Sequence, residues 1–178
     1  MAFFLTNGII IAVVFIILSG LKVVKEYERG VKFTLGKYSG IMKPGLRLII
    51  PLFQSWDRVD MRVKAVDVPD VDCITKDNVS VRVNAVLYFK IADSKLAILS
   101  VENYFYATSQ LSQTTMRDVV GEVSLDDLLS KRDVLSKRIQ QLVDKATDPW
   151  GIKVDSVDLK HIEFPQDMKR MMAREAES

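Results

Sequence analysis

Residues 79–91, VSVRVNAVLYFKI, are the most regular alternating stretch of the sequence. Apolar side chains alternate here with polar ones, and the apolar positions are Val79, Val81, Val83, Ala85, Leu87 and Phe89. A period of two residues is typical of a β-strand that buries one face. The pair Asp77-Asn78 directly before the stretch favours a turn. The stretch therefore predicts a long strand with one face against a core.

The sequence before this strand is also β-like. Alternating or apolar runs predict three shorter strands, at residues 30–36, 46–50 and 59–68. The first is expected to place on one face Val31, Phe33 and Leu35, and the third to place on one side Val59, Met61, Val63 and Ala65. Pro44-Gly45 predicts a turn between the first two strands.

After Asp93 the hydrophobic period changes from two to about 3.6 residues, the period of an α-helix. Helices are predicted at residues 94–101, 104–120 and 125–147. Ser124 followed by Asp127 approximates a capping box at the start of the third helix, with Asp126 and Asp127 at its positive end. The core-facing stripe of this helix is expected to be Leu125, Leu128, Leu135, Ile139, Leu142 and Ala146.

Residues 148–151, DPWG, break the third helix, and Trp150 is expected to fill the core at this turn. A returning strand is then predicted at 152–162, with a slip in its alternation between Val154 and Val157. Pro165 suits the first position of a final helix, which is expected to be cut short at Ser178. The soluble part should be one α+β unit in two subdomains that meet near residue 92.

Residues 1–21 contain no charged side chain. About 20 such residues in a helix cover a hydrocarbon core of about 30 Å. The segment lacks the basic start and the cleavage site of a signal peptide, so an uncleaved transmembrane helix is expected rather than a signal peptide or a buried core helix. The residues expected to contact lipid are Phe3, Phe4, Ile9, Ile10, Ile11, Val13, Val14, Phe15, Ile16, Ile17 and Leu18.

Positive charge follows this segment on one side only, beginning with Lys22, Lys25 and Arg29. The positive-inside rule then predicts a single-pass protein of the cell membrane with its N-terminus outside and residues 25 onward in the cytoplasm. These cations can also attract anionic lipids, although neighbouring glutamates soften the effect. The alternative is a plain stop-transfer flank.

Few residues in the chain are suited to catalysis. Cys73 is the only cysteine and is expected to pack in a core, while His161 is the only histidine and is expected at a surface or an interface. No nucleophile elbow, phosphate-binding loop or zinc-protease motif occurs. A net charge of +2 gives no basic field for nucleic acid. We therefore predict no catalytic, cofactor-binding or metal-binding residues and no nucleic-acid partner.

Three blocks of sequence carry a family resemblance. They are Lys25-Glu-Tyr-Glu-Arg-Gly30 through Lys43-Pro-Gly-Leu46 to Val59-Asp-Met-Arg62; Thr75-Lys-Asp77 with the strand after it; and Gln113-Thr-Thr-Met-Arg117 through Asp148-Pro-Trp-Gly-Ile-Lys-Val154 to Met168–Glu177. In this order they resemble the stomatin, prohibitin, flotillin and HflK/C superfamily, also called SPFH or Band 7. The resemblance is closest to the stomatin-like proteins called slipins.

The resemblance implies a transmembrane helix followed by an SPFH domain of mainly antiparallel sheet plus helices. The expected divisions are an anchor at 1–24, a β-rich subdomain at 25–92, an α/β subdomain at 93–164 and the start of a coiled-coil helix at 165–178. Eukaryotic stomatins are similar in having a membrane hairpin with a central proline and nearby palmitoylated cysteines. Neither feature carries over, because this sequence has no proline before Pro44 and no cysteine near the anchor.

Contacts between protomers are expected on two helices. One helix has an uncharged polar face, which suits either protomer contact or solvent exposure and is made of Gln110, Ser112, Gln113, Thr114 and Thr115. With the resemblance, contact is favoured at Gln110, Gln113 and Arg117. Met168 and Met172 lie four residues apart and are expected to begin an amphipathic coiled coil.

The resemblance implies a non-enzymatic scaffold. Copies held at one membrane would assemble into a ring or cage, organise a membrane microdomain and regulate membrane proteins or proteolysis. The implied partners are further copies, membrane lipids and an NfeD-like or FtsH-type membrane protease, with no cofactor. One alternative is a regulator that binds a single channel, transporter or protease without a large assembly. Another is a membrane-bound hydrolase, for which the sequence designates no dyad.

Overall fold

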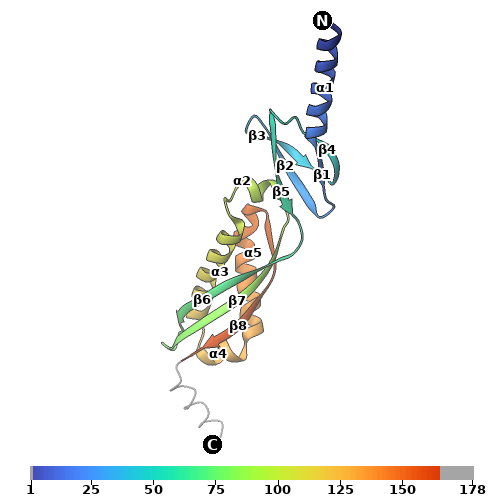
Figure 1. Ribbon diagram of the computed structural model, residues 1–178. Coiled ribbons are helices and arrows are strands. Elements are labelled where there is room, and N and C mark those ends of the chain that lie inside the picture. The colour runs from blue at the N-terminus through green and yellow to red at the C-terminus, as the bar shows by residue number, and fades with distance from the viewer. Residues whose placement is uncertain (1, 165–178) are drawn as a thin grey trace, which may run out of the picture.

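A computed structural model describes residues 2–164 of the chain, with side chains from Thr6 onward. The molecule is elongated: helix α1 (Ala2–Gly20) lies at one end, a β-rich subdomain follows, and a larger α+β subdomain lies at the other end (Figure 1). The predicted final helix, including Met168 and Met172, lies outside the described residues. The side chains of Phe3 and Phe4 lie outside them as well.

The β-rich subdomain contains two small antiparallel sheets. Its strands are β1 (Leu21–Val24), β2 (Glu28–Thr34), β3 (Lys37–Met42), β4 (Gly45–Leu48) and β5 (Gln54–Asp60). β1 pairs with β4, and the other sheet has the order β3-β2-β5. Buried Val24, Met42 and Ile49 form a small core here, with half-buried Trp56 packed against it. β3 was not predicted, and β1 occupies residues that the sequence assigned to the anchor segment.

The strand predicted at 59–68 is wrong, because the chain bends in the middle of it. Its first residues end β5, and its last residues begin β6 (Lys64–Ile74). At the bend the Asp60 carboxylate accepts hydrogen bonds from the Arg62 amide, at 2.9 Å, and from the Arg62 guanidinium, at 2.6 Å. Val63 is consequently exposed instead of sharing a buried side with Val59.

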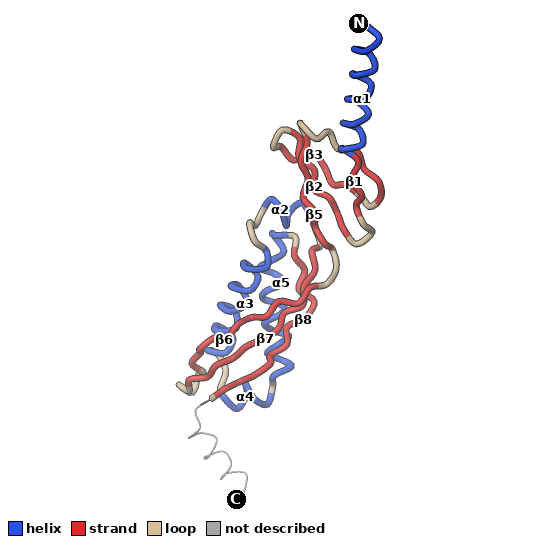
Figure 2. The backbone as a smooth tube through the Cα atoms, in the orientation of Figure 1, coloured by secondary structure: helices blue, strands red, loops and turns tan. Residues whose placement is uncertain are grey.

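The larger subdomain is a three-stranded antiparallel sheet with helices on one face. Its order is β6-β7-β8, with β7 (Ser80–Ile91) in the centre and β8 (Ile152–Glu163) on the side of α5. Figure 2 shows α3 (Tyr104–Gly121) and α5 (Arg132–Thr147) on the same face of this sheet. The alternation predicted for residues 79–91 is confirmed, since every predicted apolar position is buried. The slip predicted in the returning strand is confirmed as a register shift opposite Tyr88 and Phe89.

The helix predicted at 125–147 is two helices, α4 (Leu125–Ser130) and α5, which meet at Lys131. The predicted cap is confirmed, since the Ser124 hydroxyl accepts a hydrogen bond of 3.2 Å from the Asp127 amide. The buried stripe of α5 includes Leu135 and Ile139 as predicted, but it continues in steps of four residues to Val143 and then to Thr147. Leu142 and Ala146, predicted to face the core, are exposed.

The two subdomains share a buried contact. Val31 and Val59 of the β-rich sheet pack with Ile91 from the end of β7 and with Ala97 of α2 (Ser94–Leu99). This contact joins the subdomains through apolar side chains as well as through the chain itself. It fixes the end of the molecule that carries α1 relative to the α+β subdomain.

Gly151 forms the turn between α5 and β8, after the short 3₁₀ turn at Asp148–Trp150. It has a φ of 69°, and its carbonyl accepts hydrogen bonds from the amides of Ala92 and Asp93. The turn therefore ties the start of β8 to the end of β7. Trp150 packs half-buried against the main core, as predicted.

Helix α1 stands apart from the sheets in Figure 1, and every residue from Thr6 to Ser19 is exposed. Within residues 2–164 no helix is long and apolar enough to cross a membrane. The transmembrane span predicted from the sequence is thus not shown by the structure.

Candidate membrane-contact surface

The exposed surface of α1 is apolar on all sides. Each predicted anchor residue from Ile9 to Leu18 is at least 46% exposed, and Phe15 is 72% exposed. A helix that is hydrophobic all round normally lies inside a protein or in lipid. Here it is covered by neither, so α1 is a candidate for lipid contact.

Two turns at the α1 end of the β-rich subdomain add further apolar surface. Leu35 is 78% exposed, Leu52 is 81% exposed and Phe53 is 57% exposed. The strand face predicted for Leu35 is wrong, because Leu35 and Gly36 have φ values of 51° and 79° and form the β2–β3 turn. The Leu35 amide donates a hydrogen bond of 2.8 Å to the Phe53 carbonyl, which holds the two turns side by side.

The β1–β4 ribbon extends this surface directly beside the end of α1. Leu21 pairs with Leu48 and Val23 pairs with Leu46, so the four side chains share one face of the ribbon. All four are exposed. The Ile49 amide donates a hydrogen bond of 2.8 Å to the Gly20 carbonyl, which fixes the ribbon to the last residue of α1.

We call the exposed apolar residues around the base of α1 the apolar collar: Leu21, Val23, Leu35, Leu46, Leu48, Ile50, Leu52 and Phe53. Sequence reasoning missed the exposure of these residues because short apolar runs such as 46–50 are also typical of buried strands. Scattered exposed apolar residues are normal, but a contiguous apolar surface marks an interaction site. The collar and α1 together form the candidate membrane-contact surface.

The three predicted juxtamembrane cations are separated by the fold. Lys22 lies opposite Arg47 in the first pairs of the β1–β4 ribbon, close to α1. β1 runs away from α1, so Lys25 and Arg29 lie further along. Lys25 sits 5.6 Å from the centre of the Tyr27 ring, and a hydrogen bond to Tyr27 raises the pKa of Lys25. Arg29 donates hydrogen bonds to the backbone carbonyls of residues 26 and 28.

The residues predicted for protomer contact on α3 lie on its outer side. Gln110 and Arg117 are exposed, and Gln113 is half-buried. Tyr106, one turn before Gln110, is 65% exposed and lengthens this outer face. Ser112, which the sequence placed in the same polar face, is buried and donates a hydrogen bond of 2.7 Å within the helix.

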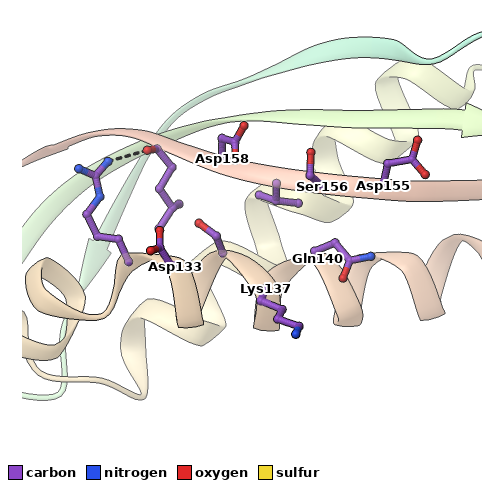
Figure 3. Close-up of a pocket in the computed structure, with 10 residues that line it drawn as sticks. Asp133, Lys137, Gln140, Asp155, Ser156 and Asp158 are labelled. Carbon is purple, nitrogen blue, oxygen red and sulfur yellow. Dashed lines mark hydrogen bonds between the residues drawn. The ribbon is translucent and has the colours of Figure 1, made fainter.

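A groove of about 580 Å³ lies between α5 and β8, on the α+β subdomain (Figure 3). Polar side chains of α5 there bind the outer backbone edge of β8. Arg132 donates to the Leu159 carbonyl at 2.5 Å, and Gln140 donates to the Val154 carbonyl at 2.8 Å. These bonds satisfy an exposed strand edge, which is a structural role.

The two residues considered for chemistry lie apart from these surfaces. Cys73 is 3% exposed, and its thiol donates to the Val71 carbonyl at 3.6 Å. Burial raises the pKa of the Cys73 thiol, which disfavours the nucleophilic thiolate. His161 is exposed on β8, where its amide donates to the Asn84 side chain. The described part of the chain contains no group of three His, Cys, Asp or Glu side chains that could hold a metal ion.

The fold and this surface define a class of protein: a two-subdomain α+β domain with an uncovered apolar helix and an apolar collar at one end. The model of the SPFH domain / Band 7 family matches residues 22–178. The chain belongs to this family, and within it the chain is stomatin-like.

Relatives support this placement. The chain is 51% identical over 176 residues to a stomatin homolog of Pyrococcus horikoshii, a match that covers 99% of this chain and 66% of the relative. It is 44% identical over 160 residues to Stomatin-4 of Caenorhabditis elegans, covering 89% of this chain and 57% of that protein. Mechanosensory protein 2 of the same nematode is 40% identical over 160 residues, covering 89% and 33%. The chain thus spans about two thirds of the Pyrococcus relative and less of the others.

Proposed function

We propose that this protein is a membrane-attached scaffold that works by assembling with copies of itself rather than by catalysis. The observation that carries the proposal is the uncovered apolar surface of α1, continued by the apolar collar. Burying one large apolar side chain stabilises by about 1.5–3 kcal/mol. Nine such residues on α1 and eight in the apolar collar, at one end of the molecule, favour attachment to lipid strongly.

The outer face of α3 supports the assembly part of the proposal. Tyr106, Gln110 and Arg117 offer an aromatic ring, an amide and a guanidinium, which are groups suited to protein contacts. Attachment confines all copies to one surface and raises their effective concentration. Weak lateral contacts can then close a ring or cage in which no subunit keeps an open edge.

Several finer predictions belong to this proposal. They are a single crossing with residues 25 onward in the cytoplasm, organisation of a membrane microdomain, and regulation of an NfeD-like or FtsH-type protease. Orientation can be tested with Cys73 replaced by serine and one cysteine placed at Lys37, which is exposed. Labelling of that cysteine by an impermeant maleimide in intact cells would contradict the orientation.

Light scattering coupled to size exclusion in mild detergent tests the scaffold directly. We expect large discrete assemblies from the full-length protein. A single copy per particle across a wide range of protein concentration would reject the scaffold and favour a regulator that binds one partner. A hydrolytic turnover that survives purification and is abolished by one substitution would reject the non-enzymatic part of the proposal.

A further inference from the structure

A second groove, of about 480 Å³, lies in the β-rich subdomain between β3 and β4. Its size falls in the range of small-molecule sites, about 300–1,000 Å³. Three cations line it: Lys32 from β2, Lys43 from the β3–β4 turn and Arg47 from β4. No carboxylate is among its lining residues.

The charge of this groove is not balanced by the fold. The ion pairs formed within residues 2–164 involve other cations, at positions 62, 64, 82, 90, 131, 138, 153 and 160. Lys22, the Cα partner of Arg47 in the ribbon, adds a fourth cation near the groove. The α5–β8 groove differs in this respect, because it is lined by three aspartates beside two cations. Arg47 donates a hydrogen bond of 3.1 Å to the Lys43 carbonyl, which leaves its charge unbalanced. Like charges gathered without acidic partners favour an anionic ligand.

The groove also has an apolar wall. Ile41, Leu46 and Leu48 line it together with the cations, and Leu46 and Leu48 belong to the apolar collar. Leu48 pairs with Leu21, the first residue after α1. The basic groove therefore opens beside the apolar collar, close to the end of α1.

Gly40 and Ser39 shape the floor of the groove. Gly40 is the Cα partner of Lys32 and has a φ of 144°, a backbone conformation that residues with a side chain rarely adopt. A Cβ built at Gly40 would meet no atom within 4 Å, so the space beside Gly40 is open. The Ser39 hydroxyl, which also lines the groove, accepts a hydrogen bond of 3.0 Å from Thr34 and donates one of 3.4 Å to the Lys32 carbonyl.

We propose that this groove binds the phosphate of an anionic membrane lipid, with Lys32, Lys43 and Arg47 around the phosphate and the apolar wall against the acyl chains. The proposal rests on the membrane attachment proposed above and adds a head-group specificity to it. The guanidinium group of arginine and the ammonium group of lysine are the side-chain groups that bind phosphate oxygens best. A soluble phosphate would meet the same cations but could not use the apolar wall.

The test compares vesicle flotation of three versions of the full chain, diluted from detergent into preformed vesicles. The vesicles are neutral phosphatidylcholine, alone or with about one quarter phosphatidylglycerol. The groove variant carries K32Q, K43Q and R47Q. The control variant carries K37Q, K76Q and K145Q, which remove the same charge at exposed positions that do not line the groove.

We expect phosphatidylglycerol to raise binding of the wild-type chain and of the control variant, and the groove variant to lose that gain by roughly tenfold or more. Binding to neutral vesicles should be equal for all three, and circular dichroism should show equal folding. Equal losses in the two variants would reject the groove as the binding site and would indicate diffuse electrostatic attraction between the protein and the anionic vesicles. Failure of the wild-type chain to bind neutral vesicles would instead overturn the attachment itself.

A second arm separates lipid from free phosphate. Glycerol phosphate is titrated against the chain in neutral detergent micelles, with chemical shifts of the groove residues as the readout. We expect no saturable shift at millimolar concentration. Tight binding of glycerol phosphate would overturn the assignment to a lipid and identify a soluble phosphate ligand.

Discussion

Leu35 and Phe53, which lie in different turns, are joined by a backbone hydrogen bond of 2.8 Å from the Leu35 amide to the Phe53 carbonyl. The bond holds exposed leucine and phenylalanine side chains beside each other at the α1 end of the molecule. The backbone conformation of the two turns holds both side chains at the surface, where they are not packed in a core. They can therefore be replaced without opening a cavity.

We predict that L52S with F53S weakens binding to neutral vesicles by roughly tenfold or more, since two large apolar groups no longer enter lipid. The matched control is V134S with L142S on α5, which are 64% and 44% exposed at a distance from the collar. Flotation and thermal melts of both variants provide the comparison. The same loss in both pairs would mean that the collar has no special part in attachment.

A second prediction concerns the outer face of α3. Q110E with R117E places two carboxylates where neighbouring copies would meet, and like charges brought together disfavour contact. Light scattering in mild detergent should show smaller assemblies and unchanged stability, because both residues lie outside the core. K145E on the exposed side of α5 is the control. Full-size assemblies from the α3 variant would place the protomer contact elsewhere.

The hydrogen bonds from Arg62 lower the pKa of Asp60 from 3.8 to about 2. Unfolded Asp60 therefore binds protons more readily than folded Asp60 between these values. The stabilisation that the Asp60–Arg62 pair gives to the folded state is fully present above about pH 4 and is lost as the pH falls through 2. Screening at this partly exposed site limits it to about 1 kcal/mol.

D60N should accordingly lose about 1 kcal/mol at pH 7 and show a flatter dependence of stability on pH below 4 than the wild-type chain. Chemical unfolding at pH 7, 4 and 3 measures this difference. Parallel curves for the two proteins would show that the Asp60–Arg62 pair contributes nothing to acid sensitivity.

Gly151 and Gly36 allow a fourth prediction, because both have positive φ but differ in their surroundings. A Cβ at Gly151 would lie 2.5 Å from the Asp93 carbonyl oxygen, while one at Gly36 would meet nothing within 4 Å. G36A should cost about 1 kcal/mol of backbone strain. G151A should cost at least about 2 kcal/mol more, since the turn that joins β7 and β8 must shift. Equal unfolding free energies would contradict the crowding at Gly151.

The sequence predicted the β7 strand, the capping serine and the slip in β8 because each depends on near neighbours in the chain. It failed at residues 59–68, where alternation continues through a bend that is set by one side chain, Asp60, folding back on Arg62. It failed on Leu142 because the buried stripe of α5 goes from Ile139 to Val143 in a step of four residues, where the prediction took a step of three.

The candidate surface was predicted only in part, and the reason is again physical. Continuous apolar residues in α1 are visible in the sequence, whereas the collar is assembled from two turns and a ribbon that meet only in space. An exposed leucine in a short apolar run has the same signature as a buried one. Only the positive φ at Leu35 and the cross-strand pairs reveal which way these segments face.

The edge of β8 carries a consequence for how copies can join. Arg132, Gln140 and Asp144 of α5 occupy backbone groups that a strand from another molecule would need in order to extend this sheet. Main-chain pairing at this edge is therefore blocked, and copies that meet at β8 must do so through side chains. Such a joint releases one copy without unzipping a sheet, so the proposed assembly would exchange copies at this edge without exposing strands that aggregate.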